Sequence, residues 1–542
     1  MIVTTIEQWT EWQRQGCNRL PAIRKVKLPP HSWKPSTWSG AWAAASEHAI
    51  VLESGKDGRY TYLGLRPDTV IRGKGESAVI EQWSGREPGA QDGAPMRTTA
   101  AGKPLEVVRQ WMAGRRGPRV ADAPKWLGGL AGFWSYDIVR TIERLPVLAE
   151  DDLGLPDYLF LELNELWILD HAAAELICVR QASVSAGAAD SADATAIRQL
   201  YDEANKHTEA MLRIWDDIVT EAESPQAAER LAARQRMMGA DNLQIDVEAL
   251  QGLTSPFPKG RYKAAVERIR DYIGQGDVFQ VNLSLRASKR TDVHPDELYE
   301  WLRVLNPSPY MGYLRCPDLQ LVSASPELLV ESRDGRLAAR PIAGTRRRGR
   351  TPEEDRRMAD ELRVSEKERA EHIMLVDLMR NDLGRIAKYG TVRVTDLMVI
   401  EYYSHVMHLV SQVEGVLAAG KDAYDVIAAS FPGGTITGAP KIRTMEIIEE
   451  LEPTRRGPYT GSLGWIDYNG DMEFNIIIRT MTVKDGNVHI QAGAGIVIDS
   501  DPEREYYESL NKAKALWKAI EYSEAWMASA AGQAGPSEEE QA

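Results

Sequence analysis

The chain contains few cysteines and no long apolar run. Its three cysteines, Cys17, Cys178 and Cys316, lie far apart and lack the spacing of a metal or redox motif, which suits a reducing compartment. No segment approaches the roughly 20 apolar residues of a membrane span, and the N-terminus lacks the apolar core of a signal peptide. No repeat of fixed period occurs. These absences predict a cytoplasmic protein that does not contact membranes.

Positive charge is also in the minority. The 542 residues include 79 acidic and 65 basic side chains, a formal net charge of −14. Such a balance argues against nucleic acid as the main partner. The apolar content is ordinary and the length allows about two to four average domains, so a sizeable core is expected.

Composition divides the chain into four parts. Residues 18–170 alternate strand-like runs with Gly-rich turns and form a first, β-rich domain. Residues 186–250 are rich in Ala, Asp, Glu and Arg and predict a connector of exposed helices. Residues 256–520 contain the candidate chemistry. Residues 528–542 are small, polar and acidic, which is typical of a disordered tail.

The first part predicts several strands. Residues 49–54 and 59–64 are expected to pair as a hairpin around a Gly-containing turn. Residues 127–134 have strand character, with glycines that permit close backbone approach. Residues 158–169 are predicted to form one further strand.

Two predicted helices carry paired carboxylates. Glu368 and Glu371 are three residues apart and share a helix face, and Glu505 and Glu508 repeat this arrangement far downstream. Lys512 lies one further turn along the second face. Carboxylate oxygens are the ligands that Mg²⁺ prefers. A single Glu-x-x-Glu pair is more often a solvated helix face, so both interpretations stay open on these residues alone.

A strictly alternating strand is predicted over residues 277–286. Phe279 and Val281 belong to its apolar side, whereas Gln280 and Asn282 belong to its polar side. The strand is therefore either half-buried with a solvated polar face or part of a binding site. Glu327 follows another apolar strand and is a candidate proton donor. A lone histidine such as His408, in a β-branched and aromatic stretch, is more often structural than catalytic.

Two Gly-rich segments expose backbone N–H groups. Residues 431–441 lead into a helix, and residues 491–496 contain two glycines. The first is not a nucleotide P-loop, because no Gly-Lys-Ser/Thr closes it, but such amides can hold an anion. With Arg479 and Lys512 nearby in the predicted arrangement, the pattern indicates a small substrate with two negative charges.

Taken in order, these motifs resemble the chorismate-utilising enzymes, which include anthranilate synthase component I, aminodeoxychorismate synthase component I, isochorismate synthase and salicylate synthase. The likeness covers residues 256–520, and residues 18–170 resemble the leading region of the two members that add an amine. The resemblance implies an α+β fold, an α/β sandwich of two large antiparallel sheets with helices outside and the active site between the sheets.

The resemblance also implies roles for individual residues. Glu371 and Glu508 would coordinate Mg²⁺, supported by Glu368 and Glu505. Glu327 would be the general acid that helps to expel the C4 hydroxyl of chorismate. The remaining implied residues line the reaction centre or bind the substrate carboxylates: Thr345, His408, Gln280, Tyr459, Arg479, Gly493, Ala494, Gly495 and Lys512.

The residue type at Gln280 indicates whether water or ammonia attacks chorismate. Family members that add water carry a Lys there as general base, and a Gln amide cannot accept a proton at neutral pH. This favours ammonia and argues against an isochorismate-type isomerase. A catalytically inactive binding subunit is disfavoured because all four carboxylates, Arg479 and Lys512 are present. No Gly-x-Cys-x-Gly glutaminase motif occurs, so the resemblance implies a separate glutamine amidotransferase subunit.

Two aminating activities remain. Many aminodeoxychorismate synthases, which deliver nitrogen to C4 for 4-aminobenzoate and folate, have a covalent Lys where this chain has Ala343. Ala343 resembles anthranilate synthases, which add nitrogen at C2 in tryptophan synthesis, or a subgroup of the first enzymes. Asn282 and residues 433–438 and 473–475 resemble the aminodeoxychorismate type, which we prefer.

One further region resembles the tryptophan feedback site of anthranilate synthases, and tryptophan is either an inhibitor or a structural ligand there. Its residues are Leu52, Glu53, Ser54, Asn306, Pro307, Tyr310 and Met311.

Overall fold

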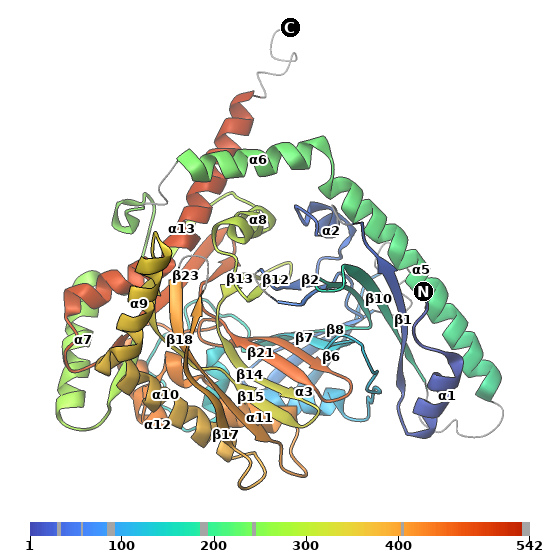
Figure 1. Ribbon diagram of the computed structural model, residues 1–542, viewed down its shortest axis with the longest axis horizontal. Coiled ribbons are helices and arrows are strands. Elements are labelled where there is room, and N and C mark those ends of the chain that lie inside the picture. Colours follow the sequence, from blue (N-terminus) through green and yellow to red (C-terminus); the bar gives the residue numbers. More distant parts are fainter. Residues whose placement is uncertain are drawn as a thin grey trace.

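Two antiparallel sheets form the centre of the molecule, and helices cover them on the outside (Figure 1). The structure is a computed structural model that describes residues 1–29, 34–55, 58–83, 93–184, 193–240, 245–402 and 406–533. This architecture confirms the α+β sandwich expected from the sequence. No helix within the described ranges is both long and apolar enough to cross a membrane.

Sheet A has 11 strands among the described residues. In spatial order they are β1 (Arg19–Lys27), β10 (Glu175–Ser183), β9 (Glu165–Asp170), β3 (Tyr60–Gly64), β2 (Ala49–Glu53), β12 (Tyr310–Arg315), β13 (Gln320–Ser325), β22 (Thr480–Lys484), β23 (Asn487–Ile496), β11 (Gln280–Arg290) and β19 (Gly438–Ala439).

Sheet B has 12 strands in the same described part of the chain. In order they are β16 (Ile342–Arg347), β18 (Val406–Val416), β15 (Arg336–Ala339), β14 (Leu328–Arg333), β21 (Met472–Ile476), β20 (Ser462–Asp467), β7 (Gly129–Trp134), β8 (Tyr158–Leu163), β4 (Thr69–Lys74), β5 (Ser77–Gln82) and β6 (Met96–Ala101), with β17 (Arg393–Tyr402) paired to β18.

The α-helices connect these strands. They are α1 (Ile6–Arg14), α2 (Ser39–Ala44), α3 (Pro104–Met112), α4 (Val139–Ile142), α5 (Asp193–Ala222), α6 (Pro225–Ala240), α7 (Lys259–Gly274), α8 (Pro295–Leu305), α9 (Pro352–Val364), α10 (Glu366–Gly384), α11 (Ala423–Ser430), α12 (Lys441–Leu451) and α13 (Pro502–Gln533).

The sheets share one core and each has a second core beneath its helices. In β7, Ala131 and Phe133 pack between the sheets, whereas Leu130 and Trp134 face the helices outside sheet B. This period of two follows from the pleat of a strand that is buried on both faces. Because both faces of the central strands are apolar, they hold the two sheets and the outer helices in a fixed arrangement.

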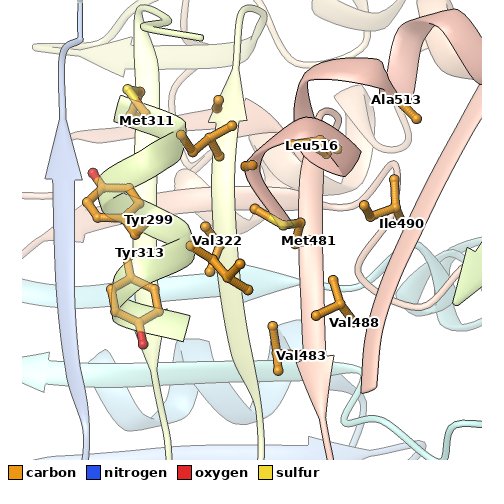
Figure 2. Close-up of a cluster of buried hydrophobic side chains, with 14 of the residues drawn as sticks. Tyr299, Met311, Tyr313, Val322, Met481, Val483, Val488, Ile490, Ala513 and Leu516 are labelled. Atoms are coloured by element: carbon orange, nitrogen blue, oxygen red, sulfur yellow. The ribbon is translucent and has the colours of Figure 1, made fainter. Parts of the chain in front are cut away.

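Helices α8 and α13 pack on the outer face of sheet A. Tyr299 of α8 stacks on Tyr313 of β12, with ring centroids 5.4 Å apart, and Leu516 of α13 lies over Met481 of β22 (Figure 2). These helices are distant in sequence but share one apolar cluster. This packing holds the start of α13, which carries the second carboxylate pair, beside β23.

Strands from the two large predicted domains alternate within both sheets. Glu53 of β2 pairs with Met311 of β12, and Trp134 of β7 pairs with Ser462 of β20. Residues 18–170 and 256–520 are therefore two stretches of sequence that both contribute strands to each sheet. Helices α5 and α6 occupy the predicted connector.

Several local predictions are confirmed and others need correction. The hairpin of β2 and β3 forms as expected. The single strand predicted over residues 158–169 is wrong, because β8 belongs to sheet B and β9 to sheet A. Asn164 between them hydrogen-bonds Asp68 and Tyr468, which fixes the crossing point. The apolar side predicted for Phe279 is also wrong, because Phe279 precedes β11 and is 71% exposed. Helix α13 continues to Gln533, so residues 528–533 of the predicted tail are helical and the rest lies outside the described residues.

Candidate active site

The polar side of β11 is buried. Gln280, Asn282 and Ser284 are all at most 9% exposed, which excludes the solvated strand face left open by the sequence. The side-chain amide of Gln280 donates a hydrogen bond of 3.2 Å to the carboxylate of Glu371 on α10. Ser365 caps this helix, since its hydroxyl accepts a hydrogen bond from the backbone N–H of Glu368. Strand β11 and the first carboxylate pair are therefore in direct contact.

Glu368 lies against the turn of β16. Its carboxylate forms a 3.1 Å ion pair with Arg346, and a β-carbon added at Gly344 would lie 2.9 Å from its Oε2 atom. Gly344 has a φ of +64°, so this position requires glycine both for its conformation and for the close approach. The structure thus places β16 against the face of α10 that carries Glu368.

His408 lies beside this turn. Its Nδ1–H donates a 3.2 Å hydrogen bond to the carbonyl of Gly344, and burial lowers the pKa of the imidazole. The backbone of Thr345 lies opposite His408 in the β16–β18 register. The two residues expected at the reaction centre are therefore neighbours in sheet B.

Glu327 has the properties of a proton donor. It follows β13, is 6% exposed, and its Oε1 atom has no hydrogen-bond partner among the described residues. Burial raises the pKa of Glu327 to about 7, although the Thr435 hydroxyl and the charge of Arg479 act in the opposite direction. A carboxyl group with this pKa is protonated in a substantial fraction of molecules near neutral pH, as general-acid catalysis requires.

Arg479 faces Glu327 from the segment before β22. Its φ of +50° is unusual for a residue other than glycine, and such conformations concentrate at functional sites. Burial lowers the pKa of Arg479, while the carboxylate of Glu327 raises it. The guanidinium is well suited to bind a carboxylate of the substrate.

The glycines of β23 lie directly beside the polar side of β11. Gly493 and Gly495 pair with Ser284 and Asn282, and a β-carbon at Gly495 would lie 2.3 Å from the amide nitrogen of Gln280. A side chain at Gly495 would therefore displace the amide of Gln280. Ala494 between them belongs to the outer core under α13, so it can serve a ligand on this side only through its backbone.

The second carboxylate pair reaches the same strand from α13. Lys512 donates a 3.0 Å hydrogen bond to the carbonyl of Gly493 and forms a 3.0 Å ion pair with Glu508. The side chain of Asp501 accepts a hydrogen bond from the N–H of Arg504 and so caps the start of this helix. Glu505 lies one turn before Glu508 on this helix.

The ring of Tyr459 lies beside Arg456, which hydrogen-bonds to β11. Arg456 was not among the site residues predicted from the sequence. Arg456 donates to the carbonyl of Asn282 (2.8 Å), forms a buried ion pair with Glu452, and lies 5.7 Å from the Tyr459 ring. Glu452 and Arg456 are four residues apart, a spacing that is common on exposed helices. Nothing in that pattern distinguishes a buried pair, so sequence reasoning could not find it.

The four carboxylates suit Mg²⁺ by their chemistry, since all their donor atoms are hard oxygens. They approach the β11–β23 pair from two helices, Glu371 through Gln280 and Glu508 through Lys512. Within the described ranges, no three or more His, Cys, Asp or Glu side chains gather closely enough to hold a metal ion. The metal role of these residues therefore stays a prediction.

A cavity of about 940 Å³ lies between the sheets. Its described lining includes Leu52, Glu53, Ser54, Tyr310 and Met311, five of the residues predicted for tryptophan, but neither Asn306 nor Pro307. Among the described residues its lining also lacks Gln280, Glu371 and Arg479. Five of the residues predicted for tryptophan therefore line a cavity to which these three candidate catalytic residues do not contribute.

Glu53 anchors the wall of this cavity. Its carboxylate accepts hydrogen bonds from Arg303 (2.9 Å), Tyr299 (3.1 Å) and the Trp38 indole (3.0 Å). Burial alone would raise the pKa of Glu53, but the charges of Arg303 and Lys34 and these hydrogen bonds lower it to about 2. The carboxylate is therefore ionised and engaged with the protein.

Comparison with known proteins identifies the family of the chain. The chain matches the chorismate binding enzyme family over residues 47–518. It is 45% identical over 506 residues to aminodeoxychorismate synthase component 1 of Bacillus subtilis, covering 93% of this chain and 98% of that protein. It is 49% identical over 411 residues to anthranilate synthase component 1 of Thermus thermophilus, covering 75% and 80%.

Solved structures share the fold. Anthranilate synthase component I from Streptococcus pneumoniae aligns with a TM-score of 0.64 and 32% identity, covering 85% of this chain and 92% of that one. A menaquinone-specific isochorismate synthase from Escherichia coli aligns with a TM-score of 0.60 and 18% identity over 95% of this chain and 98% of that one, a likeness of fold alone. The chain therefore belongs to the chorismate-binding enzymes and is an enzyme that uses chorismate.

Proposed function

We propose that the chain is an aminodeoxychorismate synthase component I, which replaces the C4 hydroxyl of chorismate with an amine for the synthesis of 4-aminobenzoate and folate. The nitrogen is ammonia released by a separate glutamine amidotransferase subunit. The observation that carries the proposal is the buried amide of Gln280 beside Glu371.

The Gln280 amide suits ammonia better than water. Its nitrogen donates to Glu371, while its carbonyl oxygen Oε1 is buried and has no partner among the described residues. This oxygen can accept a hydrogen bond from ammonia, but it cannot take a proton from water. Ammonia needs no such activation, because its lone pair is already nucleophilic.

The other side chains position chorismate and move one proton. Arg479 and Tyr459 bind the enolpyruvyl carboxylate with the amides near Gly493 and Gly495, and Lys512 lies beside the ring carboxylate. Glu327 donates a proton to the departing C4 hydroxyl, which leaves as water. Bound Mg²⁺, held by Glu371 and Glu508 with support from Glu368 and Glu505, would supply a Lewis acid for the ring carboxylate.

Two features support amination at C4 of chorismate rather than at C2. The likeness to the Bacillus subtilis aminodeoxychorismate synthase extends over nearly the whole of both proteins. Asn282 also places a buried polar side chain next to Gly493, since a β-carbon there would lie 2.8 Å from its Oδ1 atom. Anthranilate synthases usually have valine at that position, so this chain has an additional buried acceptor in β11.

Anthranilate synthase component I is the second candidate. Ala343 is buried in β16, and no lysine there can form an adduct with the substrate. The 49% identity to the Thermus thermophilus enzyme favours this activity as well. In either case tryptophan is proposed as a ligand of the cavity between the sheets.

Product analysis separates the two. The purified chain is incubated with chorismate, Mg²⁺ and ammonium, and anthranilate fluorescence and pyruvate are followed together. We expect chorismate loss without either product, and 4-aminobenzoate once a suitable lyase is added. Equimolar anthranilate and pyruvate would instead identify an anthranilate synthase. Chorismate loss without any ammonia source would contradict amination altogether.

A further inference from the structure

A buried ion pair lies in the segment that carries Tyr459. Its partners, Glu452 and Arg456, are each 4% exposed, and their side chains are joined by two hydrogen bonds of 2.7 and 2.9 Å. Both residues belong to the short connection between α12 and β20, which also contains Tyr459. None of the roles proposed above uses either side chain.

Both partners of this ion pair hold strand β11. Arg456 donates a 2.8 Å hydrogen bond to the backbone carbonyl of Asn282. Glu452 accepts two hydrogen bonds of 2.8 Å, from the backbone N–H and from the hydroxyl of Ser284. Asn282 and Ser284 follow Gln280 at every second position, on the same side of the strand. The strand that carries Gln280 is thereby fixed to the ion pair at two successive positions of its polar side.

The guanidinium of Arg456 also reaches the Gly-rich segment and the residue after Tyr459. One of its nitrogens donates to the carbonyl of Ile436 (2.8 Å) and to the hydroxyl of Thr460 (3.3 Å). That hydroxyl in turn donates to the carbonyl of Tyr459 (2.6 Å). Thr460 has a φ of +59°, a strained conformation for a β-branched residue that persists only where its surroundings hold it. Arg456 provides one of the contacts that hold Thr460 next to Tyr459.

Arginine is required to make all of these contacts at once. A guanidinium has five N–H donors in one rigid plane, and Arg456 makes five hydrogen bonds to acceptors in β11, the Gly-rich segment and its own segment. Lysine has a single ammonium group on a flexible stem, so it could not span these acceptors together. One planar group therefore fixes the positions of three segments relative to one another.

We propose that Arg456, held in place by Glu452, is a positioning residue that sets the distance between the strand of Gln280 and Tyr459. The inference rests on the proposed function, in which Gln280 favours ammonia and Tyr459 binds the enolpyruvyl carboxylate of chorismate. Without the planar donors of Arg456, the two sides of the site shift relative to each other, although every group that touches a substrate is still present. Chorismate and ammonia are then both bound less tightly.

Two variants and a matched control test this role. Arg456→Lys keeps the positive charge but loses the planar array of donors. Thr460→Val keeps the shape of the side chain and leaves the ion pair intact, but removes the hydroxyl that Arg456 contacts. Arg234→Lys is the control, because Arg234 is 3% exposed on the connector helix α6 and also donates two hydrogen bonds to one glutamate, Glu297 (2.7 and 2.8 Å). Chorismate loss with Mg²⁺ is followed over a concentration series of chorismate and of ammonium, and the melting temperature of each variant is recorded.

We expect Arg456→Lys to raise the KM of both chorismate and ammonium by about 10-fold or more, and Thr460→Val to raise the KM of chorismate alone by about threefold. Arg234→Lys should leave both KM values unchanged. A purely structural role would lower only the fraction of folded enzyme, and hence kcat, and unchanged KM values in the variants would overturn the proposal. If Arg456→Lys does not fold, the KM of Thr460→Val for chorismate decides alone. A wild type that consumes no chorismate with ammonium would instead refute the proposed function, and this inference with it.

Discussion

The amide nitrogen of Gln280 lies 3.2 Å from a carboxylate oxygen of Glu371, and this hydrogen bond joins β11 to α10. It holds Glu371 beside the strand that pairs with β23. It uses one of the two N–H donors of the amide, while the carbonyl oxygen is buried and has no partner among the described residues. This hydrogen bond therefore involves both a proposed metal ligand, Glu371, and the residue that favours ammonia as the nucleophile, Gln280.

Replacement of Gln280 by methionine should weaken the use of Mg²⁺. The variant keeps the length of the side chain but loses the hydrogen bond that orients Glu371. Because partners of metal ligands typically contribute 10- to 100-fold to metal affinity or activity, the Mg²⁺ concentration for half-maximal rate should rise by about that factor. Steady-state rates over a Mg²⁺ series measure this. Gln275→Met, at the exposed end of α7, is the control, and an unchanged Mg²⁺ requirement would refute the orienting role.

Glu508→Gln should abolish turnover that depends on Mg²⁺ while leaving the fold intact. The side chain is 53% exposed and its only ion pair in the described structure is with Lys512, so little stability is at stake. Glu521→Gln is a matched control, because Glu521 lies on the same helix and forms a similar 3.1 Å pair with Lys518. Turnover rates and melting temperatures of both variants test whether activity is lost while the fold is kept. Normal turnover by Glu508→Gln would remove Glu508 from the metal site.

Glu327 should make the rate depend on pH near neutrality. Its pKa is raised to about 7, and a general acid must be protonated, so the rate should fall as the pH rises through 7. Glu327→Gln cannot donate the proton and should lose about 10²- to 10⁴-fold in kcat. A pH–rate profile of the wild type and kcat of the variant test this. A rate that stays constant from pH 6 to 8.5 would exclude Glu327 as the acid.

The raised pKa of Glu327 also makes the free energy of unfolding depend on pH. Because the folded pKa lies above the ordinary value of 4.5, the contribution of Glu327 is most favourable below pH 4.5 and is lost as the pH rises through 7. The shift of this pKa from 4.5 to about 7 corresponds to about 3 kcal/mol in the free energy of unfolding. Urea unfolding at pH 5.5 and 8.5 should therefore show a smaller loss of stability in Glu327→Gln than in the wild type. Glu353→Gln, at an exposed carboxylate, should behave as the wild type.

Arg303→Leu should destabilise the protein strongly. Arg303 pairs with Glu53 and Glu300, which are 3% and 4% exposed, and its loss leaves Glu300 without this cation and Glu53 with Lys34 alone. Breaking a buried ion pair from one side lowers the free energy of unfolding by about 3–5 kcal/mol. Chemical denaturation measures the change. Arg356→Ala, which breaks an exposed pair with Glu353, should change stability by less than about 1 kcal/mol.

The sequence by itself determined the local elements and much of the candidate chemistry. Helix α10 with its pair of glutamates, the cap of α13 at Asp501 and the β2–β3 hairpin all follow from spacing, capping and turn residues within a few positions of each other. These signals are local, so they need no knowledge of the fold. The absence of a base at Gln280 is likewise visible in the residue type.

Only the tertiary structure decided which elements meet. Strands from both halves of the chain share each sheet, the run over residues 158–169 divides between the sheets at Asn164, and Arg456 reaches Asn282 through a buried pair with Glu452. Such contacts depend on which surfaces are buried together, and hydrophobic periodicity specifies that a face is buried without specifying its partner.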